Sequence, residues 1–294
     1  MEKSKVYFTK EITPESLIRI YKALGVELKG KVGVKISTGE PGGPNYLHPE
    51  LTGDLAHLPN GPIIECCTAY GARRQDPAEH WKAIEEHGFK AMAPCDIMDE
   101  HEEMDLPVQN GFHLDKDIVG KNFANYDSVL VLSHFKGHAM AGLGGALKNI
   151  SIGIASTQGK AYIHTAGVTT DAAELWSKLP PQDHFLESMA DACQAIIAYK
   201  GAENMVYINV ANRLSVDCDC SANPAEPEMA DLGIFASLDP VAVDQACYDA
   251  VLNSPDPGKK ALIERMESKH GIHTVEAAAQ LGLGNREYEI VSLD

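Results

Sequence analysis

The sequence predicts an α/β fold, in which mostly parallel or mixed sheets are flanked by helices and two lobes enclose a cleft. Strand-like and helix-like segments alternate along the chain, which is typical of a largely parallel sheet covered by helices. The 294 residues suffice for two domains of ~150 residues. We expect an N-terminal lobe over residues 1–170 and a C-terminal lobe over 171–294, although no long linker separates them and a single domain also fits.

In the first half of the chain, a helix is predicted over 12–24. Thr13 or Pro14 begins it, and Leu17, Ile20 and Leu24 line one face. Gly88 is expected to end a further helix over 77–87 as its C-cap. The other expected elements are a short helix over 49–58 and strands over 31–36, 62–66, 97–98, 112–113, 117–119 and 128–132.

In the second half, the apolar segment 147–156 is predicted to be helical, although its alternating isoleucines would also suit a strand. Residues 161–163 look strand-like. Asp239 precedes Pro240 in the pattern of a helix N-cap followed by the first helical residue. The other expected elements are helices over 183–200, 240–252, 260–269 and 274–281 and strands over 206–210, 234–237 and 288–291.

Composition and charge restrict the class of protein. A hydrophobic content of 44% with 23% charged residues is ordinary for a soluble globular chain. The net charge of −17 argues against nucleic acid or an anionic membrane as the main partner, but leaves room for a local basic pocket that binds a small anionic organic ligand. No segment resembles a signal peptide or a membrane span, so we expect a cytoplasmic protein. Nothing in the sequence indicates an oligomeric state.

The seven cysteines are an odd number and lack the paired spacing of a secreted scaffold. In a reducing compartment we therefore expect thiols or metal ligands and not structural disulfides.

The most unusual chemistry lies between Ser133 and His164, directly after the hydrophobic strand 128–132. Histidines and lysines surround a glycine-rich turn there: His134, His138, His164, Lys136, Lys148, Gly142, Gly144 and Gly145. In open α/β sheets ligands bind beyond the carboxyl ends of the strands, so we expect the functional site at this loop. Imidazoles bind metals and transfer protons near neutral pH.

The glycine-rich turn is neither a Walker motif nor a dinucleotide fingerprint, since no Ser or Thr follows Lys148 and no G-x-G-x-x-G is present. Its three glycines are expected to let the backbone approach a cofactor closely, unless they only form a tight turn. Asn149 is a further candidate cofactor contact. Lys148 lies in an apolar run, where burial readily lowers a lysine pKa and prepares the amine as a nucleophile or base. The alternative is that its amine extends to water.

Two other segments carry candidate ligands. Cys218, Asp219 and Cys220 offer soft and hard metal donors together, although this segment alone is also compatible with a plain acidic loop. Tyr70, a candidate cofactor contact, and Arg73 follow the strand 62–66 and so belong at the same sheet edge as the histidines. A guanidinium group matches a carboxylate or phosphate, and ordinary surface charge is the alternative for Arg73.

Four separated motifs also carry a family resemblance: ECCTAYGARR with a following EEHGF (65–89), SHFKGHAMAGLGGALKNISIG (133–153), VDCDC (216–220) and DLGIFASLDPVAVDQAC (231–247). In this order they resemble the domain-of-unknown-function 362 family. The resemblance implies an α/β protein, related to members described as iron–sulfur-centre proteins that frequently carry an inserted ferredoxin module. Only Cys193 lies between His164 and Val216, so that insert is absent and two conventional 4Fe–4S clusters are not expected.

A more distant likeness concerns His138, Lys148 and His164, which are spaced ten and then sixteen residues apart around the glycine-rich turn. This spacing is similar to that of the lactate racemase family, whose equivalent residues hold a nickel-pincer cofactor. The resemblance implies Lys148 as the covalent anchor, His164 as the metal ligand and His138 as a catalytic base. The upstream arginine and histidine motifs of the racemases do not align clearly with this chain.

These patterns predict a protein that binds a metal ion or metallocofactor, with nickel, iron and zinc equally compatible. The expected ligands are His134, His138, His164, Cys218, Asp219 and Cys220. As an enzyme of the racemase, epimerase or oxidoreductase kind, it would transfer protons, hydride or electrons on a small anionic organic molecule, with His138 and Lys148 as catalytic groups and Arg73 on the anion. Two other functions stay open: an iron–sulfur electron-transfer or accessory protein, and a metal-free module for a small anion.

Overall fold

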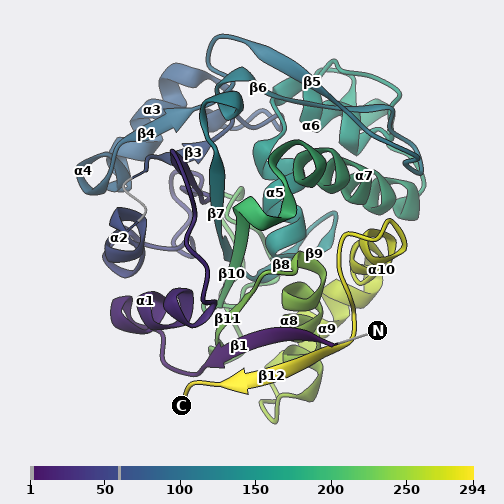
Figure 1. The fold of residues 1–294 in the computed structure, drawn as a ribbon. Helices are drawn as coiled ribbons and strands as arrows, with labels where there is room; N and C mark the ends of the chain where they lie inside the picture. Colours follow the sequence, from purple (N-terminus) through teal and green to yellow (C-terminus); the bar gives the residue numbers. More distant parts are fainter. Residues whose placement is uncertain (1–2, 59–60) are drawn as a thin grey trace.

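The computed structural model, which describes residues 3–58 and 61–294, is built around an eight-stranded sheet (Figure 1). In spatial order the strands are β12 (Tyr288–Ser292), β1 (Ser4–Thr9), β11 (Gly233–Ser237), β10 (Met205–Ala211), β7 (Ser128–His134), β2 (Val32–Lys35), β3 (Ile63–Glu65) and β4 (Cys95–Ile97). Strand β11 pairs antiparallel with both of its neighbours, whereas the other neighbouring pairs run parallel. The five strands from β10 to β4 therefore form one parallel block.

Helices cover both faces of the sheet (Figure 1). One layer contains α1 (Pro14–Ala23), α2 (Pro49–His57), α3 (Pro77–Glu86) and α4 (Phe89–Met92). The other contains α5 (Ala146–Ile154), α6 (Thr157–His164), α7 (Gln182–Lys200), α8 (Pro240–Asn253), α9 (Lys259–Ser268) and α10 (His273–Gln280). Strand β7 separates the two cores: Leu130 faces the first layer, and Val129 and Val131 face the second, as the alternation of a strand requires.

Two small hairpins lie outside the main sheet: β5 (Glu103–Pro107) pairs with β6 (Lys116–Gly120), and β8 (Lys136–His138) pairs with β9 (Gly142–Gly144). The second hairpin follows β7 directly and folds the glycine-rich turn back over the end of the sheet. None of the described helices is both long and apolar enough to cross a bilayer.

The α/β prediction is confirmed, and so are two helix N-termini at which a side chain caps the helix. Thr13 caps α1 by accepting a hydrogen bond from the Ser16 amide, and Asp239 caps α8 through the amides of Val241 and Ala242. Gly88 ends α3 with a positive φ of 82°. Most of the ambiguous segment 147–156 is helical, because α5 runs to Ile154.

Several expectations about single elements were wrong. Strands β1, β5, β8 and β9 and helix α4 were not predicted. Phe112 and His113 lie in a bent loop, where their amides donate to the buried carboxylate of Asp191. Residues 161–163 belong to α6, which Ser156 begins by capping the Gly159 amide. Strand β7 belongs to the expected N-terminal lobe and β10 to the C-terminal one, and the two strands pair. The sheet therefore spans both expected lobes, and the boundary between them stays a prediction.

Candidate functional site

Polar side chains gather at the carboxyl edge of the parallel block. Lys35 ends β2, Glu65 ends β3 and His134 ends β7, and these three strands are neighbours. The segment that follows β10 brings Cys218 and Cys220 to the same edge. This is where open α/β sheets bind ligands.

Two hollows with shared lining residues lie at this edge. The inner one, a cavity of about 50 Å³, is lined by several cationic side chains, among them Lys35, Lys136, Lys148 and Lys160. The outer one, of about 310 Å³, is lined by Met140 and Trp176 together with both site histidines, His138 and His164. Three residues line both hollows: Tyr70, Cys218 and Cys220. The two thiols therefore lie where a hollow with many cations borders a more apolar one.

The Cys218 thiol is the most polarised group of the site. Lys148 Nζ lies 3.4 Å from its sulfur, and the Cys220 amide lies 3.5 Å from the same atom. A hydrogen bond from the Cys220 thiol, followed by the charge of Lys148, holds the pKa of Cys218 well below its usual range, while the pKa of Cys220 is raised. The pair thus consists of one thiolate and one thiol.

Lys148 differs from the sequence expectation. Burial, the largest influence, lowers its pKa, but the neighbouring Cys218, Cys220 and Asp219 together outweigh burial and raise it. The amine is therefore held as an ammonium ion beside Cys218. The expected free amine, ready to act as a nucleophile or base, was wrong for this state of the site.

The histidines of the outer cavity are fixed in opposite tautomers. His138 Nδ1 accepts hydrogen bonds from the amides of Met140 (3.1 Å) and Ala141 (2.9 Å), so a neutral His138 carries its proton on Nε2. His164 Nδ1 donates to the Lys160 carbonyl over 2.7 Å, so its Nε2 presents a lone pair. Burial lowers the pKa of both imidazoles, that of His164 to about 3, which keeps them neutral.

His138 is nevertheless close to both thiols. One donor atom each from His138, Cys218 and Cys220 lies within 4.8 Å of the others. Residues from the middle and the last third of the chain therefore share one cavity.

His134 and Asp219 are positioned differently from the other expected ligands. His134 Nδ1 lies 2.8 Å from Asp219 Oδ1 and its Nε2 lies 2.6 Å from the Asn212 carbonyl, so both ring nitrogens face acceptors. Lys136 Nζ donates to Asp219 Oδ2 over 2.6 Å. Burial alone would raise the pKa of Asp219, but His134 and Lys136 lower it to about 2. With these atoms engaged, the pair supports the Cys218 segment and offers no open donor.

Two glycines of the glycine-rich turn, Gly142 and Gly145, pack closely against other parts of the protein. Gly142, with a φ of +75°, packs against Gly271, where an added Cβ would lie 2.8 Å from its Cα. Gly144 and Gly145 line the inner cavity. A Cβ on Gly145 would lie 2.3 Å from Asp244 Oδ1, whose carboxylate accepts from the Ala146 and Leu147 amides. Asp244 thus occupies the N-terminus of α5, where a phosphate would otherwise bind.

The remaining candidates divide between the cavity and the surface. Asn149 lines the inner cavity and accepts a hydrogen bond from Lys35 Nζ over 2.9 Å. The Tyr70 ring meets His164 edge-on, with 5.3 Å between ring centroids. Arg73 is not brought to the site: it is partly exposed and paired with Glu79 and Glu86.

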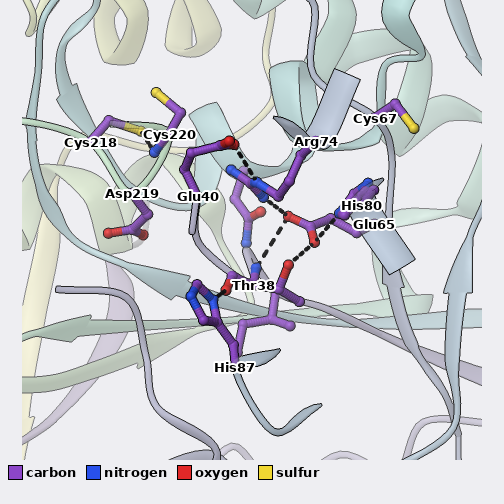
Figure 2. A network of polar contacts seen from close by, with 12 residues as sticks. Thr38, Glu40, Glu65, Cys67, Arg74, His80, His87, Cys218, Asp219 and Cys220 are labelled. Atoms are coloured by element: carbon purple, nitrogen blue, oxygen red, sulfur yellow. Dashed lines mark hydrogen bonds and ion pairs between the residues drawn. The ribbon is translucent and has the colours of Figure 1, made fainter. Parts of the chain in front are cut away.

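Arg74, and not Arg73, lies at the cavity. It is buried and bridges Glu40 and Glu65, at 3.1 and 2.7 Å (Figure 2). Glu65 also accepts from Thr38 and contacts His80, and burial, which would raise its pKa, is outweighed by Arg74 and His80, which lower it. The Glu40 amide donates to the Asp219 carbonyl over 2.7 Å, so this network supports the loop that carries the thiols.

Sequence reasoning missed three charged residues of the inner cavity: Lys35, Glu65 and Lys160. The first two carried a usable signal, because each is a single charge at the end of a short apolar strand. Lys160 carried none, since it lies in a segment of mixed polarity within α6.

Comparisons with known proteins place the chain in a family. No curated protein matches the sequence. Among solved structures, it is similar to the lactate racemase apoprotein from Thermoanaerobacterium thermosaccharolyticum, at 13% identity and a TM-score of 0.49 over 84% of this chain and 57% of that chain. It is also similar to a crystal structure from Thermotoga maritima, at 15% identity and a TM-score of 0.43 over 92% of this chain and 59% of that one. The chain thus spans less than three fifths of the length of each. A family model described as "Domain of unknown function (DUF362)" matches residues 32–249, most of the sequence, so the chain belongs to the DUF362 family.

Proposed function

We propose that this protein binds a transition-metal ion or metallocofactor through Cys218, Cys220 and His164, and uses it in an enzymatic reaction on a small anionic organic molecule. The observation that carries the proposal is the meeting of both thiols with His138 within 4.8 Å, in a cavity that His164 also lines. Thiolate and imidazole donors together suit nickel, iron and zinc.

The donors fit such a group in their protonation and support. Cys218 is already a thiolate next to Lys148. His164 has the arrangement usual for a metal-bound imidazole, with one ring N–H donated to a backbone carbonyl and the other nitrogen open. Loss of the Cys220 proton on metal binding would complete a set of two thiolates and one imidazole.

His138 is assigned a different role, although it is the imidazole nearest to the thiols. Two backbone amides occupy its Nδ1, so its Nε2 keeps a proton and is a poor ligand. We assign it to proton transfer with the substrate at Nε2. A bound metal would supply Lewis acidity or an acceptor for electrons or hydride, and Lys148 would balance the negative charge of Cys218.

The donor count favours this proposal over the iron–sulfur alternative. A conventional cluster requires about four protein ligands, usually thiolates. Among the described residues, the only thiols in the potential metal-binding groups are Cys218 and Cys220. Cys66 is buried, and its thiol donates to the Ile154 carbonyl.

The test is elemental analysis of protein purified without oxygen, followed by titration with Ni²⁺, Fe²⁺ and Zn²⁺. We expect close to one metal per chain, its loss in a Cys218→Ser, Cys220→Ser variant, and at least about tenfold weaker binding in His164→Ala. His138→Ala should keep the metal, and Cys95→Ser, a half-buried thiol on β4, is the matched control. The proposal fails if no metal co-purifies and none binds on addition, or if the double variant binds as well as the unsubstituted protein.

A further inference from the structure

Two buried lysines line the inner cavity without a carboxylate partner. Lys35 is 1% exposed, and its Nζ donates to the Ile36 carbonyl (3.1 Å) and to Asn149 Oδ1 (2.9 Å). Lys160 is 3% exposed, and its Nζ donates to the Ala155 carbonyl. Among residues 3–58 and 61–294, no ion pair involves either amine. Both belong to the lining of the same cavity.

The other cations of this cavity all have an anion. Lys136 is paired with Asp219, Arg74 with Glu40 and Glu65, and Lys148 with the Cys218 thiolate. The carboxylate with the largest electrostatic effect on Lys35 is Glu65. Its oxygens already bind Thr38, Arg74 and His80. Two ammonium groups at the inner end of the cavity therefore have no directly paired anion among the residues that line it.

Such burial is costly. An ammonium group taken out of water needs a counter-ion to recover its solvation energy. Burial lowers the pKa of Lys35 to about 8, and the charges of Lys160 and Lys148 add to this effect against the opposing charge of Glu65. The two lysines thus destabilise each other unless an anion lies between them.

An independent observation points to the same place. Thr68 also lines the inner cavity, and its buried hydroxyl has no hydrogen-bond partner within the described part of the chain. A buried hydroxyl is normally hydrogen-bonded. One group that accepts hydrogen bonds and carries negative charge would satisfy both lysines and this hydroxyl.

We propose that the inner cavity is a carboxylate-binding subsite, in which Lys35, Lys160 and Thr68 hold the carboxylate of a small organic acid. The rest of the molecule then extends toward Cys218 and His138. The proposal deepens the proposed function and rests on it only in treating this cavity as the substrate site.

A carboxylate fits better than a phosphate ester. The inner cavity encloses only about 50 Å³, which is far below the several hundred Å³ usual for a whole ligand. The amides at the N-terminus of α5 are the ones a phosphate would use, and Asp244 already occupies them.

The subsite is tested on metal-free protein in a chelating buffer, so that its outcome does not depend on the metal centre. Acetate, propionate, lactate and inorganic phosphate are titrated at constant ionic strength, and binding is followed by calorimetry and by the thermal unfolding midpoint. We expect saturable binding of a carboxylate with a rise in the midpoint. Lys35→Met and Lys160→Met should each weaken this binding at least tenfold. Lys260→Met, at an exposed lysine, should leave it unchanged.

A second readout separates loss of binding from loss of folding. Because Lys35→Met removes a buried charge without a counter-ion, it should raise the unfolding midpoint of the ligand-free protein while it removes the shift caused by the carboxylate. The subsite is refuted if no carboxylate binds more tightly than chloride, if phosphate binds and carboxylates do not, or if both methionine variants bind as the unsubstituted protein does. Carboxylate binding retained in the Cys218→Ser, Cys220→Ser variant would support the subsite even if the metal proposal failed.

Discussion

At Lys35, burial and function oppose each other. The side chain ends a strand inside an apolar core, yet its amine lies in the cavity beside Asn149. An isoleucine or methionine would fill this position at lower energetic cost. A buried charge that weakens the fold is expected where a ligand restores the balance, because functional sites commonly depart from what stability favours.

This opposition predicts a pH dependence of stability. The pKa of Lys35 falls from 10.5 to about 8 on folding, so between these values the unfolded chain holds a proton that the folded protein has lost. Unfolding then takes up protons, and the free energy of unfolding contributed by Lys35 rises with pH across this window, by up to about 3 kcal/mol.

The measurement is urea unfolding of the unsubstituted protein and of Lys35→Met from about pH 8 to about pH 10.5, in buffers free of carboxylates. We expect the stability of the methionine variant to exceed that of the unsubstituted protein at the low end and the difference to shrink toward the high end. Parallel pH profiles would contradict the assigned charge of Lys35.

Among the elements, α5 follows the glycine-rich turn and carries Lys148 and Asn149 into the site. The helix begins directly after Gly145 and has no side-chain cap of its own. Asp244 of α8 supplies the cap from another part of the chain, through 2.7 and 2.9 Å bonds to the Ala146 and Leu147 amides. Asn209 donates to the same carboxylate over 2.6 Å. Lys148 and Asn149 lie in the first turn that this cap holds in place.

Asp244→Ala is therefore expected to destabilise the protein by about 3 kcal/mol, because it leaves two helix amides and the Asn209 side chain without an acceptor in a buried position. Asp244→Asn keeps one oxygen acceptor and should cost clearly less. Chemical unfolding monitored by circular dichroism measures both changes. An alanine variant as stable as the unsubstituted protein would show that this carboxylate does not cap α5.

The elements also show what the sequence can predict. Helices that begin at Thr13 and Asp239 were predictable, since their caps lie within three residues along the chain. The cap of α5 was not, because Asp244 comes from α8. The sequence indicated Cys218 and His138 as separate candidates, but not the proton positions that distinguish their roles. Those positions depend on contacts in the folded protein, with the Met140 and Ala141 amides for His138 and with Lys148 for Cys218.

In the whole molecule, the site depends on strands from both halves of the chain. The thiols follow β10 and the histidines follow β7, and these two strands are paired over six residues, from Met205↔Val129 to Val210↔His134. Each is buried along its full length, so each needs the other to satisfy its backbone and cover its side chains. This pairing thus brings the segments that carry the thiols and His138 to the same edge of the sheet.

This arrangement predicts that residues 1–170 do not fold alone. Without β10 and α7, the central strand β7 would expose one edge and one apolar face, so the fragment should lack cooperative unfolding and native amide dispersion in NMR spectra. The full chain should unfold in one transition, with Cys218 gaining reactivity toward a thiol reagent at the same denaturant concentration at which the helical signal is lost. Co-expression of fragments 1–170 and 171–294 serves as the control, because it should restore the native spectrum if the cut itself is tolerated. A fragment 1–170 that unfolds cooperatively would instead establish an independent N-terminal lobe, and the site would then be assembled by docking two preformed units.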